Sequence, residues 1–384
     1  NFDNFSGTSR SVHYKISSEF FLKLYEKNLL VKKNINQLYC PKEKKFLPDR
    51  YVEGTCPKCN ASGARGDQCE ACGSQLDPTE LIRPYCKICN TTPILKETFH
   101  WFLKLAEFQK KLEQWQGNHK DWKDNVYNYC QGWFKEGLGD RPITRDIEWG
   151  VPVPLEEAKG KVIYVWFEAP IGYISSTIEW AEKKGEPELW KSYWKNPDCE
   201  LIHFIGKDNI VFHAITWPAT LMAQDGFILP RHIPANEFLN IEGQKLSTSR
   251  NRAVWVHEYL ENFPSDSLRY YLATIAPEAK DADFSWSEFM LKHNSELADI
   301  YGNFVNRNFT FAHRYFGSSV PPLRNPSQTD YSMLNAMEKA SKEMADYLDR
   351  FQLRLAAKVL MDVARDGNKY FNDKEPWKTR QTDI

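Results

Sequence analysis

Hydrophobic positions recur at helical spacing in three parts of the chain. The first predicts a helix over residues 17–31, and its apolar positions are Phe20, Phe21, Leu24, Tyr25 and Leu29. The second predicts helices over residues 101–136, beginning with Trp101, Leu105, Phe108, Leu112 and Trp115 on one face. Since such aromatic stripes more often serve packing than binding, we assign this one to a core. The third covers residues 299–384, where apolar faces on successive helices predict an α-helical bundle.

Two shorter apolar segments predict buried strands of a parallel sheet. Residues 162–167 are an uninterrupted apolar run, followed by a loop over residues 168–173 and then by a helix. Residues 200–205 repeat this order, with a loop over residues 206–209 and a helix over residues 211–222. Two such units in succession predict an α/β fold of Rossmann type with an open parallel sheet. Because ligands collect beyond the carboxyl ends of these strands, we expect both loops to border a ligand.

The nine cysteines gather mostly in an insert between these segments. Cys56 and Cys59 form one C-x-x-C motif and Cys69 and Cys72 form another, so four thiolates can surround one Zn²⁺ tetrahedrally. Disulfides are the alternative, but a cytosolic chain of this size neither forms them easily nor needs them. The spacing therefore predicts a structural zinc site.

A second metal site is an open alternative. Cys86 and Cys89 form a third motif, and Cys40 with Glu43 resembles a fourth whose last ligand is a carboxylate, which Zn²⁺ accepts. Cys40 and Glu43 could equally be ordinary surface residues. Residues 34–100 as a whole are rich in Cys, Pro and Gly, which predicts a metal-stapled module with little core of its own.

A lysine and hydroxyl groups just after a glycine turn indicate a polyphosphate site. In the segment 245–249, which follows Gly243, the side chains that can hold phosphate oxygens are Lys245, Ser247 and Ser249. The same short string also occurs on solvated loops that bind nothing, so its meaning depends on the rest of the chain.

Composition and charge indicate the number of domains and the class of protein to which the chain belongs. A hydrophobic content of 42% with 13 Trp supports two or three domains with sizeable cores. No apolar run is long enough to span a membrane and no leader segment is visible, so we expect a cytoplasmic protein without a membrane partner. The formal net charge is −1, so any nucleic acid must be bound by local groups rather than by overall charge.

Together these segments resemble those of methionyl-tRNA synthetases, a family of class I aminoacyl-tRNA synthetases. The resemblance runs through residues 46–50, the cysteine motifs, residues 164–173, residues 203–208 and the Lys245 loop. It implies ATP-dependent activation of L-methionine to methionyl-adenylate and transfer to the terminal ribose of tRNA(Met). In the family's K-M-S-K-S signature, Leu246 and Thr248 replace Met and the second Lys, whose role Lys245 or Arg250 could take over.

The resemblance also implies where the small substrates bind. Methionine requires a buried acid for its ammonium group and aromatic walls for its thioether. The implied residues are Trp166, Ala169, Pro170, Tyr173, Asp208, His213 and Trp217. Trp166 could instead be an ordinary strand aromatic, and His213 and Trp217 could be core residues. For ATP the implied residues are Gly206, Asp208, Asn236, Lys245 and Ser249.

Adenylation needs no covalent enzyme intermediate, so positioning and charge stabilisation should carry the reaction. We expect Lys245, Ser247 and Ser249 to neutralise the β- and γ-phosphates, with Arg145 reinforcing them. Mg²⁺ is expected to arrive bound to ATP, held partly by substrate oxygens.

The resemblance further implies an anticodon site formed by Asn303, Arg307 and Trp377. An arginine and a tryptophan suit unpaired bases, by hydrogen bonding to base edges and by stacking. Trp377 follows Pro376 and could instead plug the end of a helix.

The predicted architecture is a class I Rossmann-type catalytic domain, incomplete at its N-terminal side, with a zinc-knuckle insertion and a C-terminal anticodon-binding bundle. Its parts are residues 1–33 (end of the first catalytic half), 34–142 (insertion), 143–240 (second catalytic half), 241–298 (signature loop and stem contacts) and 299–384 (truncated helical bundle). The family's His-x-Gly-His signature for ATP is absent. We therefore expect an internal portion of a longer synthetase that cannot form adenylate alone.

Three further interpretations follow from the same pattern. Contacts with a second copy or with other synthetases would use a C-terminal region that the chain lacks. Another class I synthetase is one alternative function, although the insert is small for an editing domain. A non-catalytic tRNA-binding fragment is the other, since it fits the missing ATP signature.

Overall fold

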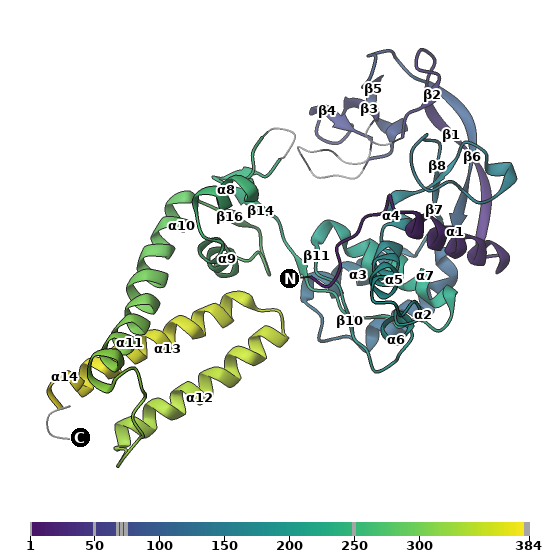
Figure 1. Ribbon diagram of the computed structural model, residues 1–384. Helices are drawn as coiled ribbons and strands as arrows, with labels where there is room; N and C mark the ends of the chain where they lie inside the picture. Colours follow the sequence, from purple (N-terminus) through teal and green to yellow (C-terminus); the bar gives the residue numbers. More distant parts are fainter. Residues whose placement is uncertain are drawn as a thin grey trace. The chain divides into compact units, whose positions relative to one another are not determined.

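The computed structural model describes residues 2–48, 51–66, 69, 72, 76–247 and 251–379. The chain divides into two compact units, Asn1–Pro234 and Ala235–Ile384 (Figure 1). The first unit is mixed α/β and the second is mostly helical. The finer division into five domains remains a prediction. None of the described helices is both long and apolar enough to cross a lipid bilayer.

A helix and a long antiparallel ribbon begin the first unit. Helix α1 (Ser11–Glu26) leads into strand β1 (Leu30–Cys40), which pairs along its whole length with β6 (Ile94–Leu103). The short strands β2 (Lys45–Phe46) and β7 (Arg141–Pro142) complete a sheet in the order β2-β1-β6-β7.

The structure corrects two predictions in this region. The helix predicted over residues 17–31 ends at Glu26, and Leu30 already belongs to β1. Trp101 lies in β6, so the stretch 101–136 is not helical from its start. Long-range pairing between β1 and β6 decides both cases, and hydrophobic spacing within a short window cannot reveal it. The helical segments that do form here are η3 (Leu105–Phe108), α2 (Gln109–Gly117) and α3 (Asp124–Glu136).

The cysteine-rich insert folds around a small sheet. Its strands are β3 (Val52–Thr55), β4 (Ser62–Arg65) and β5 (Ile82–Cys86), in the order β4-β3-β5, and a 3-10 turn η2 (Pro78–Glu80) precedes β5. The buried side chains of this module are Leu38, Cys40, Leu47, Val52, Cys56, Ala64, Cys69, Leu76, Leu81 and Cys86. Four cysteines thus lie within the module's own apolar core.

The strand predicted over residues 162–167 is wrong. Strand β9 (Val162–Ile163) is only two residues long and pairs with β8 (Thr144–Arg145) in the antiparallel sense. After Tyr164, whose backbone N–H donates to the Ile143 carbonyl at 2.8 Å, the chain turns into helix α4 (Val165–Glu168). An apolar run this short does not distinguish a buried strand from a buried helical turn.

The strand predicted over residues 200–205 is interrupted. Strand β10 (Leu201–Ile202) pairs in parallel with β12 (Pro230–His232), and β11 (Ile205–Gly206) is a separate piece. The predicted helix over residues 211–222 begins as a π-helix. The helical segments of this region are η4 (Glu156–Ala158), α5 (Ile171–Lys183), α6 (Lys191–Trp194), η5 (Lys207–Asn209), the π-helix η6 (Phe212–Thr216) and α7 (Trp217–Gln224).

The second unit begins with short strands and three helices. The strands are β13 (Ala235–Asn236), β14 (Leu239–Ile241), β15 (Gln244–Lys245) and β16 (Ala282–Phe284), and the last three form a sheet in the order β15-β14-β16. The helices are α8 (Val256–Asn262), α9 (Ser265–Thr274) and α10 (Trp286–Lys292). Tyr259, Leu268, Tyr271 and Phe284 form the buried centre of this part.

The predicted helical bundle is confirmed. Its elements are the π-helix η8 (His293–Gly302), α11 (Asn303–Phe316), α12 (Gln328–Asp349), α13 (Leu353–Lys374) and α14 (Pro376–Thr379). Helix α13 comes so close to α11 that a Cβ at Gly367 would lie 2.4 Å from the Phe304 ring. Glycine at this position therefore sets the distance between the two helices.

Candidate functional site

Three rings of the first unit meet where α5, the segment after β10 and the π-helix η6 converge. The ring centroids of Tyr173 and His203 lie 4.8 Å apart, and those of His203 and His213 lie 5.2 Å apart. Tyr173 is 40% exposed, whereas His203 and His213 are buried. The phenol therefore covers two buried imidazoles and presents an accessible aromatic face.

Hydrogen bonds assign the proton on His213. Its Nδ1 lies 3.0 Å from the Asn209 carbonyl oxygen, which can only accept, so Nδ1 carries the hydrogen. Its Nε2 then accepts from the Tyr173 hydroxyl, at 2.8 Å. The hydroxyl hydrogen is committed to His213, which leaves the phenolic oxygen as an acceptor toward a ligand.

Burial keeps this cluster uncharged. It lowers the pKa of His213, against the opposing effect of the Asn209 carbonyl. Burial and the neighbouring His213 lower the pKa of His203 to about 3. Burial also raises the pKa of Tyr173 above its usual value. At neutral pH the wall is thus aromatic and uncharged, which suits an apolar side chain rather than an ionic one.

The remaining predicted methionine residues lie on adjoining elements. Trp166 on α4 is half-buried and stacks on Phe212 at 4.9 Å. Ala169 and Pro170 link α4 to α5, with Pro170 buried. Trp217 is 1% exposed, and among the described residues its Nε1 has no hydrogen-bond partner. Trp217 is therefore fully buried, and its contact with methionine stays a prediction.

The expectation of a buried acid at Asp208 is wrong. Its side chain is exposed on the 3-10 turn η5, where the chain turns out of β11. Gly206 lies directly beneath it, because a Cβ there would meet the Asp208 Oδ1 at 2.7 Å. The acid of this loop is accessible to solvent and to a soluble ligand.

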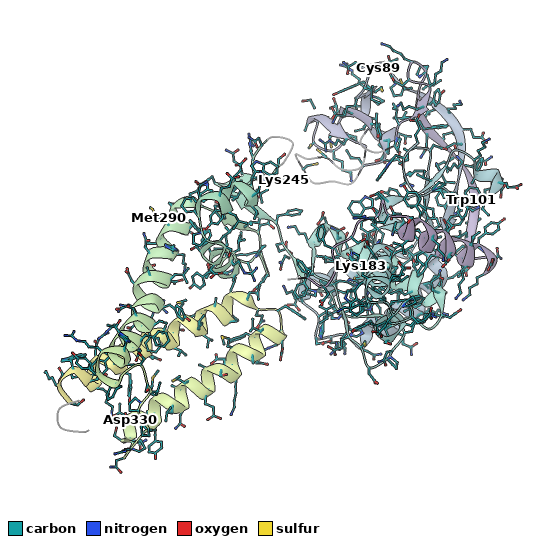
Figure 2. The ribbon with its side chains drawn as sticks, viewed as in Figure 1. Cys89, Trp101, Lys183, Lys245, Met290 and Asp330 are labelled. Carbon is teal, nitrogen blue, oxygen red and sulfur yellow. The ribbon has the colours of Figure 1, made fainter. Side chains whose placement is uncertain are left out.

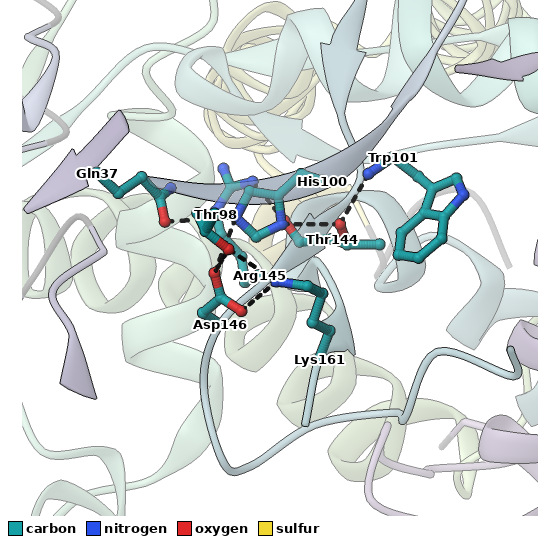
Figure 3. Close-up of polar contacts among 8 residues, drawn as sticks. All are labelled: Gln37, Thr98, His100, Trp101, Thr144, Arg145, Asp146 and Lys161. Atoms are coloured by element: carbon teal, nitrogen blue, oxygen red, sulfur yellow. Dashed lines mark hydrogen bonds and ion pairs between the residues drawn. The ribbon is translucent and has the colours of Figure 1, made fainter. Parts of the chain in front are cut away.

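Arg145 stands at the edge of a buried polar network (Figure 3). Its guanidinium carbon lies 3.6 Å from the Tyr164 ring centroid, and Nη1 donates to the Thr144 carbonyl at 3.0 Å. Tyr164 immediately precedes α4, so Arg145 is anchored next to the helix that carries Trp166.

The predicted phosphate loop lies in the second unit, where Figure 2 labels Lys245. Lys245 is exposed on β15, and Gly243 turns the hairpin with a φ of +72°. Backbone N–H groups of Ser247 and Arg252 each donate to the other's carbonyl at 2.9 Å, which closes the loop at its base. Ser249, Thr248 and Arg250 lie outside the described residues. Asn236 is half-buried on β13.

The cysteines form two clusters of sulfur atoms. In the first, the Sγ atoms of Cys56, Cys59, Cys69 and Cys72 all lie within 4.8 Å of one another, including distances of 3.9 and 3.6 Å. A tetrahedral Zn²⁺ with Zn–S bonds of about 2.3 Å requires sulfurs about 3.8 Å apart, so this donor set fits zinc. All nine cysteines are unpaired by disulfides.

The second cluster comprises Cys40, Cys86 and Cys89, the last labelled in Figure 2. The carboxylate of Glu43 is not part of it, and Glu43 instead donates its backbone N–H to the Cys40 sulfur at 3.4 Å. The predicted Cys-Cys-Cys-Glu set is therefore wrong in its fourth ligand. Three sulfurs remain as the possible protein ligands of a second ion.

The predicted anticodon residues meet at one end of the bundle. Arg307 donates to Asn372 Oδ1 at 2.6 Å, and its guanidinium carbon lies 4.4 Å from the Phe371 ring centroid. The Phe371 and Trp377 centroids are 6.0 Å apart, and Trp377 is 41% exposed. Asn303 is exposed on the same side, within 3.4 Å of Asn368.

A family model described as tRNA synthetases class I (M) matches residues 1–309. The chain belongs to this family. A methionine-tRNA ligase of Salinibacter ruber is 52% identical over 394 residues, covering 100% of this chain and 55% of the relative. One of Pyrococcus furiosus is 51% identical over 395 residues, covering 100% of this chain and 54% of the relative. This class I synthetase chain thus spans about half the length of the curated relatives it matches.

Solved structures have the same fold as this class I synthetase chain. A Mycobacterium tuberculosis methionyl-tRNA synthetase in complex with methionyl-adenylate superposes with a TM-score of 0.77 at 25% identity. The match covers 100% of this chain and 69% of that one.

Sequence reasoning missed three residues that contact the predicted site residues. His203 and Phe212 contact the predicted methionine residues, and Phe371 lies between Arg307 and Trp377. His203 opens the segment 203–208 and could have been found there. Phe371 carried no local signal, because it is one more apolar position of α13.

Proposed function

We propose that the protein containing this chain is a methionine-tRNA ligase. It activates L-methionine with ATP and transfers the methionyl group to the 3′-terminal ribose of tRNA(Met). The observation that carries this proposal is full coverage of the chain by curated relatives named methionine-tRNA ligase, with 52% and 51% of the aligned residues identical. The neutral aromatic wall of Tyr173, His203 and His213 supports it, since a thioether prefers aromatic contacts.

In the first step, an oxygen of the methionine carboxylate attacks the α-phosphorus of ATP, and the bond to the bridging oxygen breaks so that pyrophosphate leaves. Asp208 attracts the methionine ammonium, and Tyr173, Trp166 and His213 surround the side chain. Ala169 and Pro170 bring the backbone between α4 and α5 close to the substrate. Gly206 leaves room for the Asp208 carboxylate.

Negative charge develops on the leaving pyrophosphate in this step, so cationic side chains should stabilise the transition state. Lys245 and Ser247, together with Ser249, hold the β- and γ-phosphates, and Arg145 assists them. Asn236 contacts the adenosine, and Mg²⁺ arrives with ATP. In the second step the terminal ribose hydroxyl attacks the carbonyl carbon of the adenylate, and AMP leaves.

The remaining sites bind tRNA and maintain the fold. Arg307 and Trp377 bind unpaired anticodon bases by hydrogen bonding and stacking, and Asn303 adds a polar contact. Cys56, Cys59, Cys69 and Cys72 hold a structural Zn²⁺, which would crosslink the insert, and the three-sulfur cluster is a candidate for a second ion. A cytoplasmic location and contacts with other copies or synthetases through regions outside this chain belong to the same proposal.

Aminoacylation of purified tRNA(Met) tests the proposal. The whole protein, as it occurs in its cell, should charge tRNA(Met) with methionine and should charge no tRNA with isoleucine, leucine or valine. Charging with one of these instead would assign the chain to another class I synthetase. Binding of tRNA without charging by the whole protein would identify a non-catalytic tRNA-binding protein.

A further inference from the structure

A buried carboxylate lies next to Arg145 in the chain. Asp146 Oδ1 lies 2.5 Å from Lys161 Nζ, and Oδ2 accepts from Thr98 Oγ1 at 2.7 Å. His100 Nε2 lies 3.3 Å from the same Oδ2. Both oxygens of Asp146 therefore have partners that come from β6 and from the turn before β9, as the dashed lines of Figure 3 show.

The network is charged even though it is buried. The side chains of Lys161 and Asp146 are 7% and 13% exposed. Burial alone would raise the pKa of Asp146, but the hydrogen bonds from His100, Lys161 and Thr98 outweigh it and lower the pKa to about 2. Asp146 is thus a carboxylate at neutral pH, and a buried carboxylate requires a cation or several donors to remain stable.

A second chain of hydrogen bonds holds Thr144, the residue that precedes Arg145. The Trp101 backbone N–H donates to Thr144 Oγ1 at 3.1 Å, and Thr144 Oγ1 lies 3.0 Å from His100 Nδ1. Burial lowers the pKa of His100, so the ring is neutral. Nδ1 then accepts from Thr144, and Nε2 donates to Gln37 Oε1 at 3.3 Å while lying 3.3 Å from Asp146 Oδ2. His100 therefore contacts both sequence neighbours of Arg145.

Arg145 interacts electrostatically with this network. Its positive charge is one of the influences that lower the pKa of His100. Its guanidinium nevertheless lies on the Tyr164 ring and donates to the Thr144 carbonyl. The ion pair with Asp146 is formed by Lys161 instead. Without Lys161, the buried carboxylate would attract the cation that adjoins it in the chain, Arg145.

We propose that Lys161 is a positioning residue: by pairing with Asp146 it prevents this carboxylate from capturing Arg145, and so keeps the guanidinium directed to the phosphates of ATP. The proposal rests on the function proposed above, in which Arg145 assists adenylation. The roles of Lys161 and Asp146 are indirect, because neither touches the substrate. Their effect on the reaction should therefore depend on each other.

The test is methionine-dependent ATP–pyrophosphate exchange by the whole protein and its variants. Lys161→Met should reduce kcat/KM for ATP about tenfold or more, as does loss of a charged group that stabilises the transition state. Lys161→Met combined with Asp146→Asn should recover to within about threefold of wild type, because the amide no longer attracts Arg145. Lys161→Arg keeps a cation on Asp146 and should retain exchange.

A control variant measures the effect of removing the cation from an ion pair whose side chains are 38% and 44% exposed. Arg231→Met breaks an ion pair with Asp121, 2.8 Å long, elsewhere in the first unit, and should leave exchange unchanged. Unfolding temperatures of all variants record the purely structural cost. Wild-type exchange by a folded Lys161→Met protein would overturn the proposal, as would a double variant no more active than Lys161→Met.

Two results distinguish a failure of the proposed role of Lys161 from a failure of the proposed ligase function. Absence of exchange in the wild-type protein would defeat the function itself, whereas normal exchange in Arg145→Ala would defeat only the role of Arg145 and this inference with it. If Lys161→Met does not fold, the single variant Asp146→Asn tests whether the Asp146 carboxylate competes for Arg145. It should retain exchange to within about threefold, since no carboxylate remains to capture Arg145, and a tenfold loss in the folded protein would overturn the proposal.

Discussion

The Tyr173 hydroxyl donates a hydrogen bond to His213 Nε2 across 2.8 Å, in the only direction that the His213 tautomer allows. This bond holds the phenol against the two histidines, whose ring centroids lie 4.8 and 5.8 Å from its own. Because the three groups are neutral, protonation should not disturb the arrangement near neutral pH.

Tyr173→Phe should therefore weaken methionine binding moderately. Loss of one neutral hydrogen bond costs about 0.5–1.5 kcal/mol, which corresponds to a rise in KM for methionine of about two- to tenfold. The KM for ATP should stay constant in pyrophosphate exchange. Tyr193→Phe, on a 48% exposed tyrosine outside this cluster, is the matched control. Equal changes in both KM values would argue against a role confined to methionine.

Metal analysis of the purified protein should find zinc. Cys56→Ser should remove about one ion per chain and lower the unfolding temperature, because metal binding and folding of small modules are coupled. Cys40→Ser tests the three-sulfur cluster in the same way, and loss of a further ion would establish a second site. Cys199→Ser, outside both clusters, should change neither quantity. An unchanged zinc content in Cys56→Ser would refute the first site.

Trp377→Ala should impair recognition of tRNA but not of small substrates. Base stacking on an aromatic ring contributes about 1–3 kcal/mol, so KM for tRNA(Met) in charging should rise about five- to 150-fold. Phe371→Ala should have a similar effect, because this ring contacts both Arg307 and Trp377. Pyrophosphate exchange without tRNA is the control measurement. A parallel loss in both assays would mean that Trp377 only stabilises the helix end.

The acid sensitivity of the fold should depend on Asp146. The pKa of this carboxyl is about 2 in the folded protein, against 3.8 as its ordinary value. A carboxyl whose pKa is lower when folded stabilises the fold above its unfolded pKa, and that stabilisation disappears as the pH falls from about 4 to about 2. The difference corresponds to about 2 kcal/mol.

Unfolding by urea at several pH values measures this contribution. Asp146→Asn should flatten the loss of stability between pH 4 and pH 2 relative to wild type. Identical pH profiles for wild type and Asp146→Asn would contradict the depressed pKa.

Local sequence patterns predicted those helices and motifs whose residues lie close together in the chain. Helices α12 and α13 follow from their apolar spacing, and the first cluster of four cysteine sulfurs follows from the C-x-x-C motifs. The β1–β6 ribbon could not be predicted, since its pairing partners are far apart in the chain. The same holds for the network of Asp146, Lys161 and His100, which is assembled only by folding.

One expectation about the fold and one about a site failed for physical reasons. The apolar run at residues 162–167 gave no sign that the chain turns into helix α4 at Val165. Glu43 has the spacing of a ligand, but its backbone N–H, not its carboxylate, faces the Cys40 sulfur. Spacing identifies which residues can reach a site, whereas the local backbone decides which atom they present.

Methionine-dependent ATP–pyrophosphate exchange tests the central claim most directly. The whole protein should exchange pyrophosphate into ATP only when methionine is present. Lys245→Ala should reduce kcat about a hundredfold or more, as expected when a preorganised charge facing the transition state is removed. Absence of exchange with methionine, or unchanged kcat in Lys245→Ala, would contradict the account of this chain as the centre of a methionine-activating enzyme.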